Sequence, residues 1–99
     1  MEEIWTYGTW VVQPGNEDAF IAAWYDLAQW TSQSFLPGAS AHLLRDAENP
    51  QVFTSLGGWP DAETIDRWRE SEGFREHISR IVTLVASFEP HTGYVVAEV

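Results

Sequence analysis

The sequence contains no cysteine and no lysine, and these two absences exclude several kinds of chemistry. Without a thiol there is no thiolate nucleophile, no zinc–thiolate site and no disulfide framework. Without a lysine ammonium there is neither Schiff-base catalysis nor a P-loop. The sequence also has no Gly-rich dinucleotide loop and no clustered metal ligands, so we expect no metal and no cofactor.

Positive charge is scarce as well. The five basic residues are all arginines, they face fifteen acidic residues, and the net charge is −10. Such a surface repels phosphate groups, so we expect neither nucleic acid nor an anionic membrane as a partner. No apolar run approaches the ~18–20 residues of a membrane span. Glu2 and Glu3 stand where a signal peptide would be basic, which predicts a soluble cytoplasmic protein.

Aromatic residues are abundant by contrast. Six Trp, three Tyr and five Phe occur in a chain of 99 residues, which is the length of a single domain over residues 1–99. A chain this short buries only roughly 60–65% of the surface that its unfolded state exposes. Fourteen aromatic side chains therefore call for extra cover, either from a second subunit or from a ligand in a pocket.

The first half of the chain predicts a strand, a helix and a hairpin. The β-branched and aromatic residues of Ile4–Val12 are typical of a strand. Asn16 is a candidate N-cap for a helix over about Glu17–Ser34, whose apolar residues recur at helical spacing. Leu36–Gly38 should end that helix. Two strands over Ala39–Asp46 and Gln51–Trp59 should follow, and the glycines near the end of the second indicate a bulge or a close approach by another group.

The second half predicts a broken helix and a last strand. Asp61 is the candidate N-cap of the helix, and Gly73 interrupts it. The helix resumes over Phe74–Val85. A loop at Glu89–Gly93 then leads to a final strand, Tyr94–Val99.

The order β-α-β-β-α-β predicts an α+β, ferredoxin-like fold. Right-handed crossovers place both helices on one face of a four-stranded antiparallel sheet and leave the other face bare. Trp5, Tyr7 and Val11 alternate with Trp10 along the first strand, so either face is apolar. We therefore expect a homodimer that closes sheet against sheet.

Three segments carry a resemblance to a known family. They are "VVQPGNEDAFIAAW", "PGASAHLLRDAENPQVFTSLGGW" and "DAETIDRWRESEGFREHI". Together with the strands around them, they make the chain resemble the antibiotic biosynthesis monooxygenase-like proteins of the dimeric α+β barrel superfamily. The resemblance implies a homodimer with a pocket in each subunit, between the helices and the sheet.

One branch of that superfamily degrades haem, and its resemblance to this chain can be followed residue by residue. Those enzymes use an Asn on the first strand, a Trp on the second helix and a His that binds the iron. Trp68 falls on the Trp, but Gly8 occupies the Asn position and His77 stands one residue early. One residue turns a helical side chain by ~100°, so the resemblance disfavours haem degradation.

The resemblance instead favours a small cofactor-independent monooxygenase that acts on an aromatic or polyketide-like molecule. Such an enzyme needs flat apolar walls, a base and a polar group that holds oxygen. We predict a cavity between the helices and the sheet, with His77 as the base near its mouth or wall. The predicted substrate-binding residues are Trp10, Trp24, Trp68, Phe74 and His42. The alternative is a non-catalytic ligand-binding or structural dimer on the same fold, because fold does not fix function.

His77 has a second interpretation. It shares a helical face with Phe74 and Ile81, which is typical of a packed histidine with a satisfied hydrogen bond. Trp68 lies nine residues earlier, which amounts to ~180° around an unbroken helix. The two side chains can therefore share a pocket only if the break near Gly73 re-aims the second segment.

Overall fold

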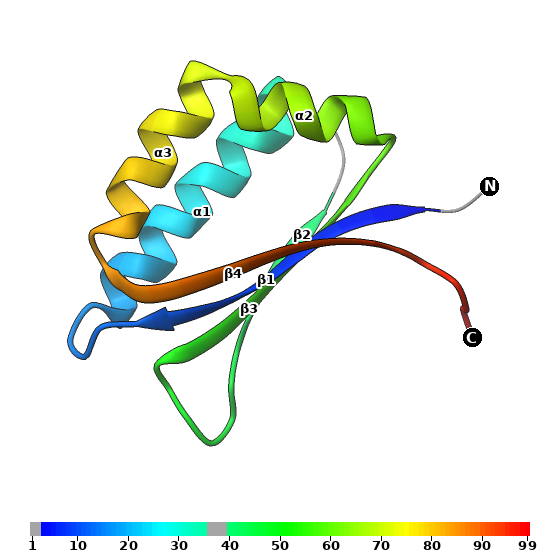
Figure 1. Ribbon diagram of the computed structural model, residues 1–99. Coiled ribbons are helices and arrows are strands. Elements are labelled where there is room, and N and C mark those ends of the chain that lie inside the picture. Colours follow the sequence, from blue (N-terminus) through cyan, green and yellow to red (C-terminus); the bar gives the residue numbers. More distant parts are fainter. Residues whose placement is uncertain (1–2, 36–39) are drawn as a thin grey trace.

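The computed structural model describes residues 3–35 and 40–99, and it has a helical layer packed on one face of a sheet (Figure 1). The strands are β1 (Ile4–Val12), β2 (Ala41–Arg45), β3 (Val52–Trp59) and β4 (Val85–Tyr94). The helices are α1 (Glu17–Ser34), α2 (Ala62–Glu70) and α3 (Glu72–Val82). The described residues contain no helix that is both long and apolar enough to cross a membrane.

The sheet has the strand order β2-β3-β1-β4, and every neighbouring pair is antiparallel. The central strand β1 pairs Gly8 with Ser55 of β3 on one side and with Pro90 of β4 on the other. This order, with the helices on one face, is the ferredoxin-like α+β architecture that the sequence predicts.

Burial alternates along β1, because successive side chains of a strand point to opposite faces. Ile4, Trp10 and Val12 face the helices and are buried. Trp10 and Val12 join Phe20 of α1, Phe53 of β3 and Ile81 of α3 in the main core cluster, alongside Leu27. The opposite face carries Tyr7 and Thr9, both exposed in the single chain. The single chain therefore covers only one face of β1.

The helical break lies at Ser71 rather than at Gly73. Ser71 has extended dihedrals, and its hydroxyl donates to the Trp68 carbonyl at 2.7 Å while accepting from the Phe74 N–H at 3.2 Å. One serine thus ends α2 and caps α3. Gly73 lies within α3, where the Trp30 ring packs against its backbone so closely that a Cβ would overlap it. The predicted site of the break was wrong by two residues, because a close approach was taken for a helix interruption.

The last strand also corrects the sequence interpretation. β4 covers Val85–Tyr94, so the segment expected to be a loop, Glu89–Gly93, is strand, and residues 95–99 are not. Helix α3 stops at Val82 instead of continuing to Val85. Pro90 suggested a loop, but β4 is an edge strand, where a residue without an N–H is tolerated.

The predicted helix caps have different outcomes. The Asp61 carboxylate accepts from the Thr64 N–H at 2.7 Å, so that cap is confirmed. Asn16 occupies the N-cap position of α1, but its side chain makes no capping bond and reaches Gln13 and the Leu84 carbonyl instead. The predicted helix end at Leu36–Gly38 and the start of the second strand at Ala39 lie outside the described residues.

Gly58 shows which of the two interpretations of the β3 glycines holds. The register between β1 and β3 continues without a shift through both glycines. A Cβ on Gly58 would lie 3.3 Å from the Trp5 ring, which packs over it on the face away from the helices. The glycine therefore admits a neighbouring ring and does not form a bulge.

Candidate functional site

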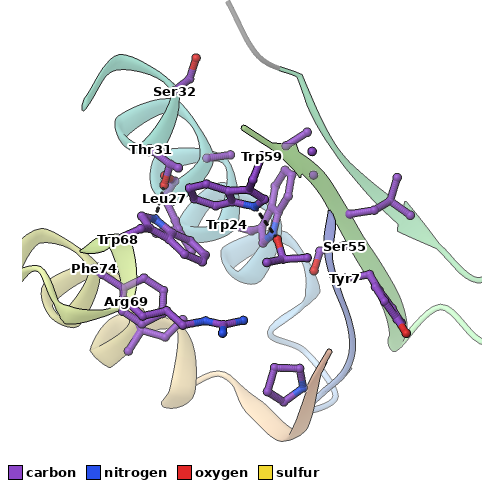
Figure 2. A pocket seen from close by; sticks show the side chains of 18 of the residues that line it. Tyr7, Trp24, Leu27, Thr31, Ser32, Ser55, Trp59, Trp68, Arg69 and Phe74 are labelled. Carbon is purple, nitrogen blue, oxygen red and sulfur yellow. Dashed lines mark hydrogen bonds between the residues drawn. The ribbon is translucent and has the colours of Figure 1, made fainter. Parts of the chain in front are cut away.

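A cavity of about 340 Å³ lies between α1, the α2–α3 segment and the helix-facing side of the sheet. Its walls are mainly aromatic, and Figure 2 shows Trp24, Trp59, Trp68 and Phe74 around it. The tryptophan and phenylalanine residues in its lining are Trp10, Trp24, Trp59, Trp68, Phe74 and Phe88. A cavity of this size and composition suits a small, flat, apolar molecule.

Three indole N–H groups of the wall are each paired with a hydroxyl. Trp10 Nε1 donates to Ser55 Oγ, Trp59 Nε1 donates to Thr6 Oγ1, and Trp68 Nε1 donates to Thr31 Oγ1, all at 2.9 Å. A buried indole N–H needs such a partner. Each pair joins two different elements, so the hydrogen bonds also fix the orientation of the rings.

These pairs determine which hydroxyl groups can still donate to a ligand. The Thr31 hydroxyl cannot, because it already donates to the Leu27 carbonyl at 2.7 Å while accepting from Trp68. Thr6 and Ser55 only accept, and within the described residues neither hydroxyl proton has an acceptor. The cavity therefore offers two hydroxyl donors on adjacent strands of its floor.

Charge is nearly absent from the lining. Among residues 3–35 and 40–99, no aspartate or glutamate lines the cavity, and Arg69 of α2 is the one lining residue with a permanent charge. Its Nη2 donates to Thr92 Oγ1 of β4 at 3.4 Å. Figure 2 shows the side chain extending from the helix beside Trp68 and Phe74 toward the strands.

Four of the residues predicted to bind substrate line this cavity. Trp10 projects from β1, Trp24 from α1, Trp68 from α2 and Phe74 from α3. The Trp68 ring contacts two other wall residues. It packs against Trp59 of β3 at 4.7 Å and edge-to-face against Phe74 of α3 at 4.6 Å between centroids. The tertiary structure thus brings them together; their contact with a substrate stays a prediction.

His77 is placed differently from the sequence-based prediction. It is not among the residues that line the cavity. Its ring stacks on Trp30 at 5.0 Å between centroids, and its Nδ1 lies 2.8 Å from the Gly73 carbonyl oxygen. The position matches the second interpretation, a packed histidine with a satisfied hydrogen bond, and gives no support to a role as the base. Trp68 and His77 do not share the cavity.

His42 lies on the other face of the sheet. It pairs with Leu56 of β3, which in turn pairs with Tyr7 of β1, and Tyr7 pairs with His91 of β4. The four residues form a row on the face away from the helices. His91, in the segment expected to be a loop, is part of β4; it stays exposed and stacks on Tyr7 at 5.2 Å between ring centroids. Tyr7 and His91 belong to the cavity lining at its edge. Figure 2 shows the side chains of Tyr7 and Trp24 on opposite sides of the strands.

Gly8 and Gly57 both lie on the helix-facing side of the sheet, but only Gly57 leaves room on the cavity floor. A Cβ on Gly8 would lie 2.5 Å from Phe88 Cε1, because the Phe88 ring covers Gly8 and stacks on Trp10 with centroids 3.6 Å apart. Gly57 lines the cavity, and its nearest neighbour is the Ala41 side chain. Phe88 thus fills the space over Gly8.

Sequence reasoning missed Thr6, Ser55 and Thr31. The alternation of β1 places Thr6 on the same face as Trp10, and that of β3 places Ser55 on the same face as Phe53, so the facing direction was available. The pairing of each hydroxyl with one particular indole was not, because the partners are 37 to 53 residues apart. Within the described chain, no group of three or more His, Cys, Asp or Glu residues could hold a metal ion.

The chain is thus a ferredoxin-like α+β domain with an aromatic cavity between its helices and its sheet. The sequence profile described as antibiotic biosynthesis monooxygenase matches residues 7–80, so the chain belongs to the antibiotic biosynthesis monooxygenase family. No curated protein sequence is significantly similar to the chain.

Solved structures show the same fold at low sequence identity. SnoaB from Streptomyces nogalater, described as a cofactor-independent oxygenase and solved as a mutant, is 18% identical with a TM-score of 0.88, and the match covers 99% of this chain and 97% of that one. A protein from Shewanella oneidensis is 20% identical with a TM-score of 0.81, covering 95% and 91%. A conserved protein of unknown function from Bacteroides thetaiotaomicron is 16% identical with a TM-score of 0.82, covering 95% and 98%.

Proposed function

We propose that the protein is a cofactor-independent monooxygenase acting on a small polycyclic phenol, hydroquinone or anthrone. The observation that carries this proposal is the cavity of about 340 Å³ with aromatic walls and two hydroxyl donors on its floor. Membership of the antibiotic biosynthesis monooxygenase family and the likeness to SnoaB support the same reaction class.

The reaction needs no redox cofactor, because the substrate itself supplies the electrons that reduce dioxygen. Loss of a proton from an electron-rich ring carbon gives a carbanion, which reacts directly with dioxygen. For an anthrone, the CH₂ carbon becomes a carbonyl, one oxygen atom enters that carbonyl, and the other leaves as water together with the two hydrogens. The protein contributes orientation, exclusion of water and stabilisation of the negative charge.

The structure suggests which residues do this work. The rings of Trp24, Trp59 and Trp68 hold the flat substrate, and the hydrogen bonds of the latter two keep the walls in place. The hydroxyls of Thr6 and Ser55 donate to the substrate oxygen on which the negative charge develops. Each already accepts from an indole N–H, which polarises it as a donor. We assign no histidine as a base, because His77 lies outside the cavity lining.

The test is oxygen consumption in the presence of a hydroxyanthrone, with quinone formation followed by absorbance. We expect the protein to accelerate both above the rate of spontaneous oxidation, with one O₂ consumed for each quinone formed. Ser55→Ala should reduce the rate by about 10-fold or more if its hydroxyl stabilises the developing charge. A Ser79→Ala control removes an exposed hydroxyl from α3 and should leave the rate unchanged. Rates that never exceed the spontaneous reaction for any phenol, hydroquinone or anthrone would refute the proposal.

The alternative is a ligand-binding protein without catalysis. It is favoured by one observation, namely that the indole donors of Trp10, Trp59 and Trp68 are all satisfied by the protein itself. This alternative predicts saturable binding of the same aromatic compounds, with no quinone formed in the presence of air.

We further propose that two copies associate through the bare face of the sheet. That face carries Trp5, Tyr7, Leu44 and Leu56, and Tyr7 and Leu44 are 44% and 54% exposed in the single chain. Large apolar side chains gathered on one open sheet favour burial against a partner. A second copy presents the same surface, so a two-fold dimer is self-complementary, as the family resemblance implies.

A further inference from the structure

The distribution of charge around the cavity is uneven. Acidic residues make up 15 of the 99 residues, yet none of those that the structure describes lines the cavity. The lining contains one arginine, although the whole chain has only five. A protein with a net charge of −10 therefore has, at this cavity, a local surface that is neutral or positive.

The position of Arg69 is set by the packing of α2 on α1. It follows Trp68, whose indole is fixed to Thr31 of α1, so α2 cannot rotate without breaking that hydrogen bond. This orientation sends the Arg69 side chain along the edge of the cavity toward β4 (Figure 2). Its placement thus follows from packing that the cavity wall itself requires.

The guanidinium of Arg69 is free to take a ligand. The one hydrogen bond that it makes to another described residue goes to the neutral hydroxyl of Thr92 and is long, at 3.4 Å. No carboxylate of the described chain pairs with it, even though Glu70 follows it directly in the sequence. A guanidinium has five N–H donors and matches a carboxylate in a two-point contact, so most of its binding capacity is unused.

We infer that the cavity takes an anionic aromatic ligand, with the ring between the tryptophans and a carboxylate or phenolate at Arg69. This inference rests on the proposed function and specifies the substrate class of the same site. The overall charge of the protein repels anions, and the absence of acids from the lining together with Arg69 offsets that repulsion locally. A neutral aromatic of the same shape gains only the ring contacts.

The test compares two flat probes that differ in charge alone, anthraquinone-2-carboxylate and anthraquinone-2-carboxamide. Binding is followed by quenching of tryptophan fluorescence, since four tryptophans line the cavity. A charge-assisted hydrogen bond predicts that the carboxylate binds about tenfold more tightly than the amide. Arg69→Gln should remove this preference by weakening only the carboxylate.

Arg75→Gln is the matched control, because Arg75 is an exposed arginine of α3 that does not line the cavity. It makes the same change in net charge and should keep the preference. The inference is overturned if Arg69→Gln retains the preference, or if Arg75→Gln loses it to the same extent. Equal binding of both probes by the unaltered protein would remove the inference alone. Binding of neither probe would remove the proposed aromatic-ligand function with it.

Discussion

Trp68 Nε1 donates a hydrogen bond of 2.9 Å to Thr31 Oγ1 and thereby joins α2 to α1 across one end of the cavity. Thr31 is 8% exposed, and its own proton goes to the Leu27 carbonyl. The contact therefore sets the position of a wall residue without using any group that a ligand would need.

Replacing this threonine should lower the stability of the fold. Thr31→Val leaves the Trp68 N–H without its acceptor at nearly constant volume, and we expect a loss of about 1–3 kcal/mol in the free energy of unfolding. Chemical denaturation monitored by circular dichroism measures it. Thr83→Val is the control, because Thr83 makes a comparable hydroxyl–carbonyl bond at an exposed position. An equal effect of the two changes would contradict a specific role for the Trp68 contact.

Gly73→Ala should destabilise the protein although alanine favours helices. The added Cβ would overlap the Trp30 ring, which must move, and overpacking of this kind costs about 1–3 kcal/mol. Thermal unfolding of Gly73→Ala, of Trp30→Ala and of the double variant checks the cause. The alanine should cost less, or become favourable, once the Trp30 ring is absent. The same cost in both backgrounds would assign the glycine some other role.

His77→Phe separates the two interpretations of this histidine. Because His77 stacks on Trp30 outside the cavity lining, we expect quinone formation and probe binding to remain close to those of the unaltered protein. The hydrogen-bonding contact with the Gly73 carbonyl is lost, which should lower the stability by about 1 kcal/mol. Abolished turnover with an unchanged melting temperature would instead restore His77 as the base.

Tyr7→Glu should weaken association between two copies. Tyr7 lies on the bare sheet face, where association of two copies would take the carboxylate of the variant out of water. Light scattering should show a dimer for the unaltered protein at micromolar concentration and a shift toward the monomer for the variant. Val82→Glu is the control, because Val82 is a similarly exposed apolar residue on α3 rather than on the sheet. A stable monomer before any change would remove the proposed dimer.

Acid should weaken the start of α2 through Asp61. The hydrogen bonds from the backbone and side chain of Thr64 lower the pKa of the Asp61 carboxyl below its ordinary value of 3.8. A carboxyl whose pKa is lowered by folding stabilises the fold above its unfolded pKa, and this contribution disappears as the pH falls through the folded pKa. Asp61→Ala should therefore lower the melting temperature near pH 7, and the difference from the unaltered protein should shrink below about pH 4.

The sequence determined the elements whose signal is local. The β-branched and aromatic residues of Ile4–Val12 marked β1, and the side chain of Asp61 marked the start of α2, because both signals depend only on near neighbours. The order of the elements then gave the ferredoxin-like sheet, since chirality rules leave few other arrangements. The same local reasoning failed at β4, where Pro90 indicated a loop and only the edge position in the sheet makes it part of a strand.

The site was decided by the tertiary structure. Helical spacing gave Trp68 and His77 opposite directions only for an unbroken helix. It did not show that the helix breaks at Ser71 or that the His77 ring stacks on Trp30. Trp10, Trp24, Trp68 and Phe74 could be named from the sequence because large apolar side chains must be buried somewhere, whereas Trp59 and Phe88 were not among the predicted residues. The hydroxyl partners of the three indoles and the approach of Arg69 to β4 depend on residues far apart in the chain, so only the packing of the helices on the sheet fixes them.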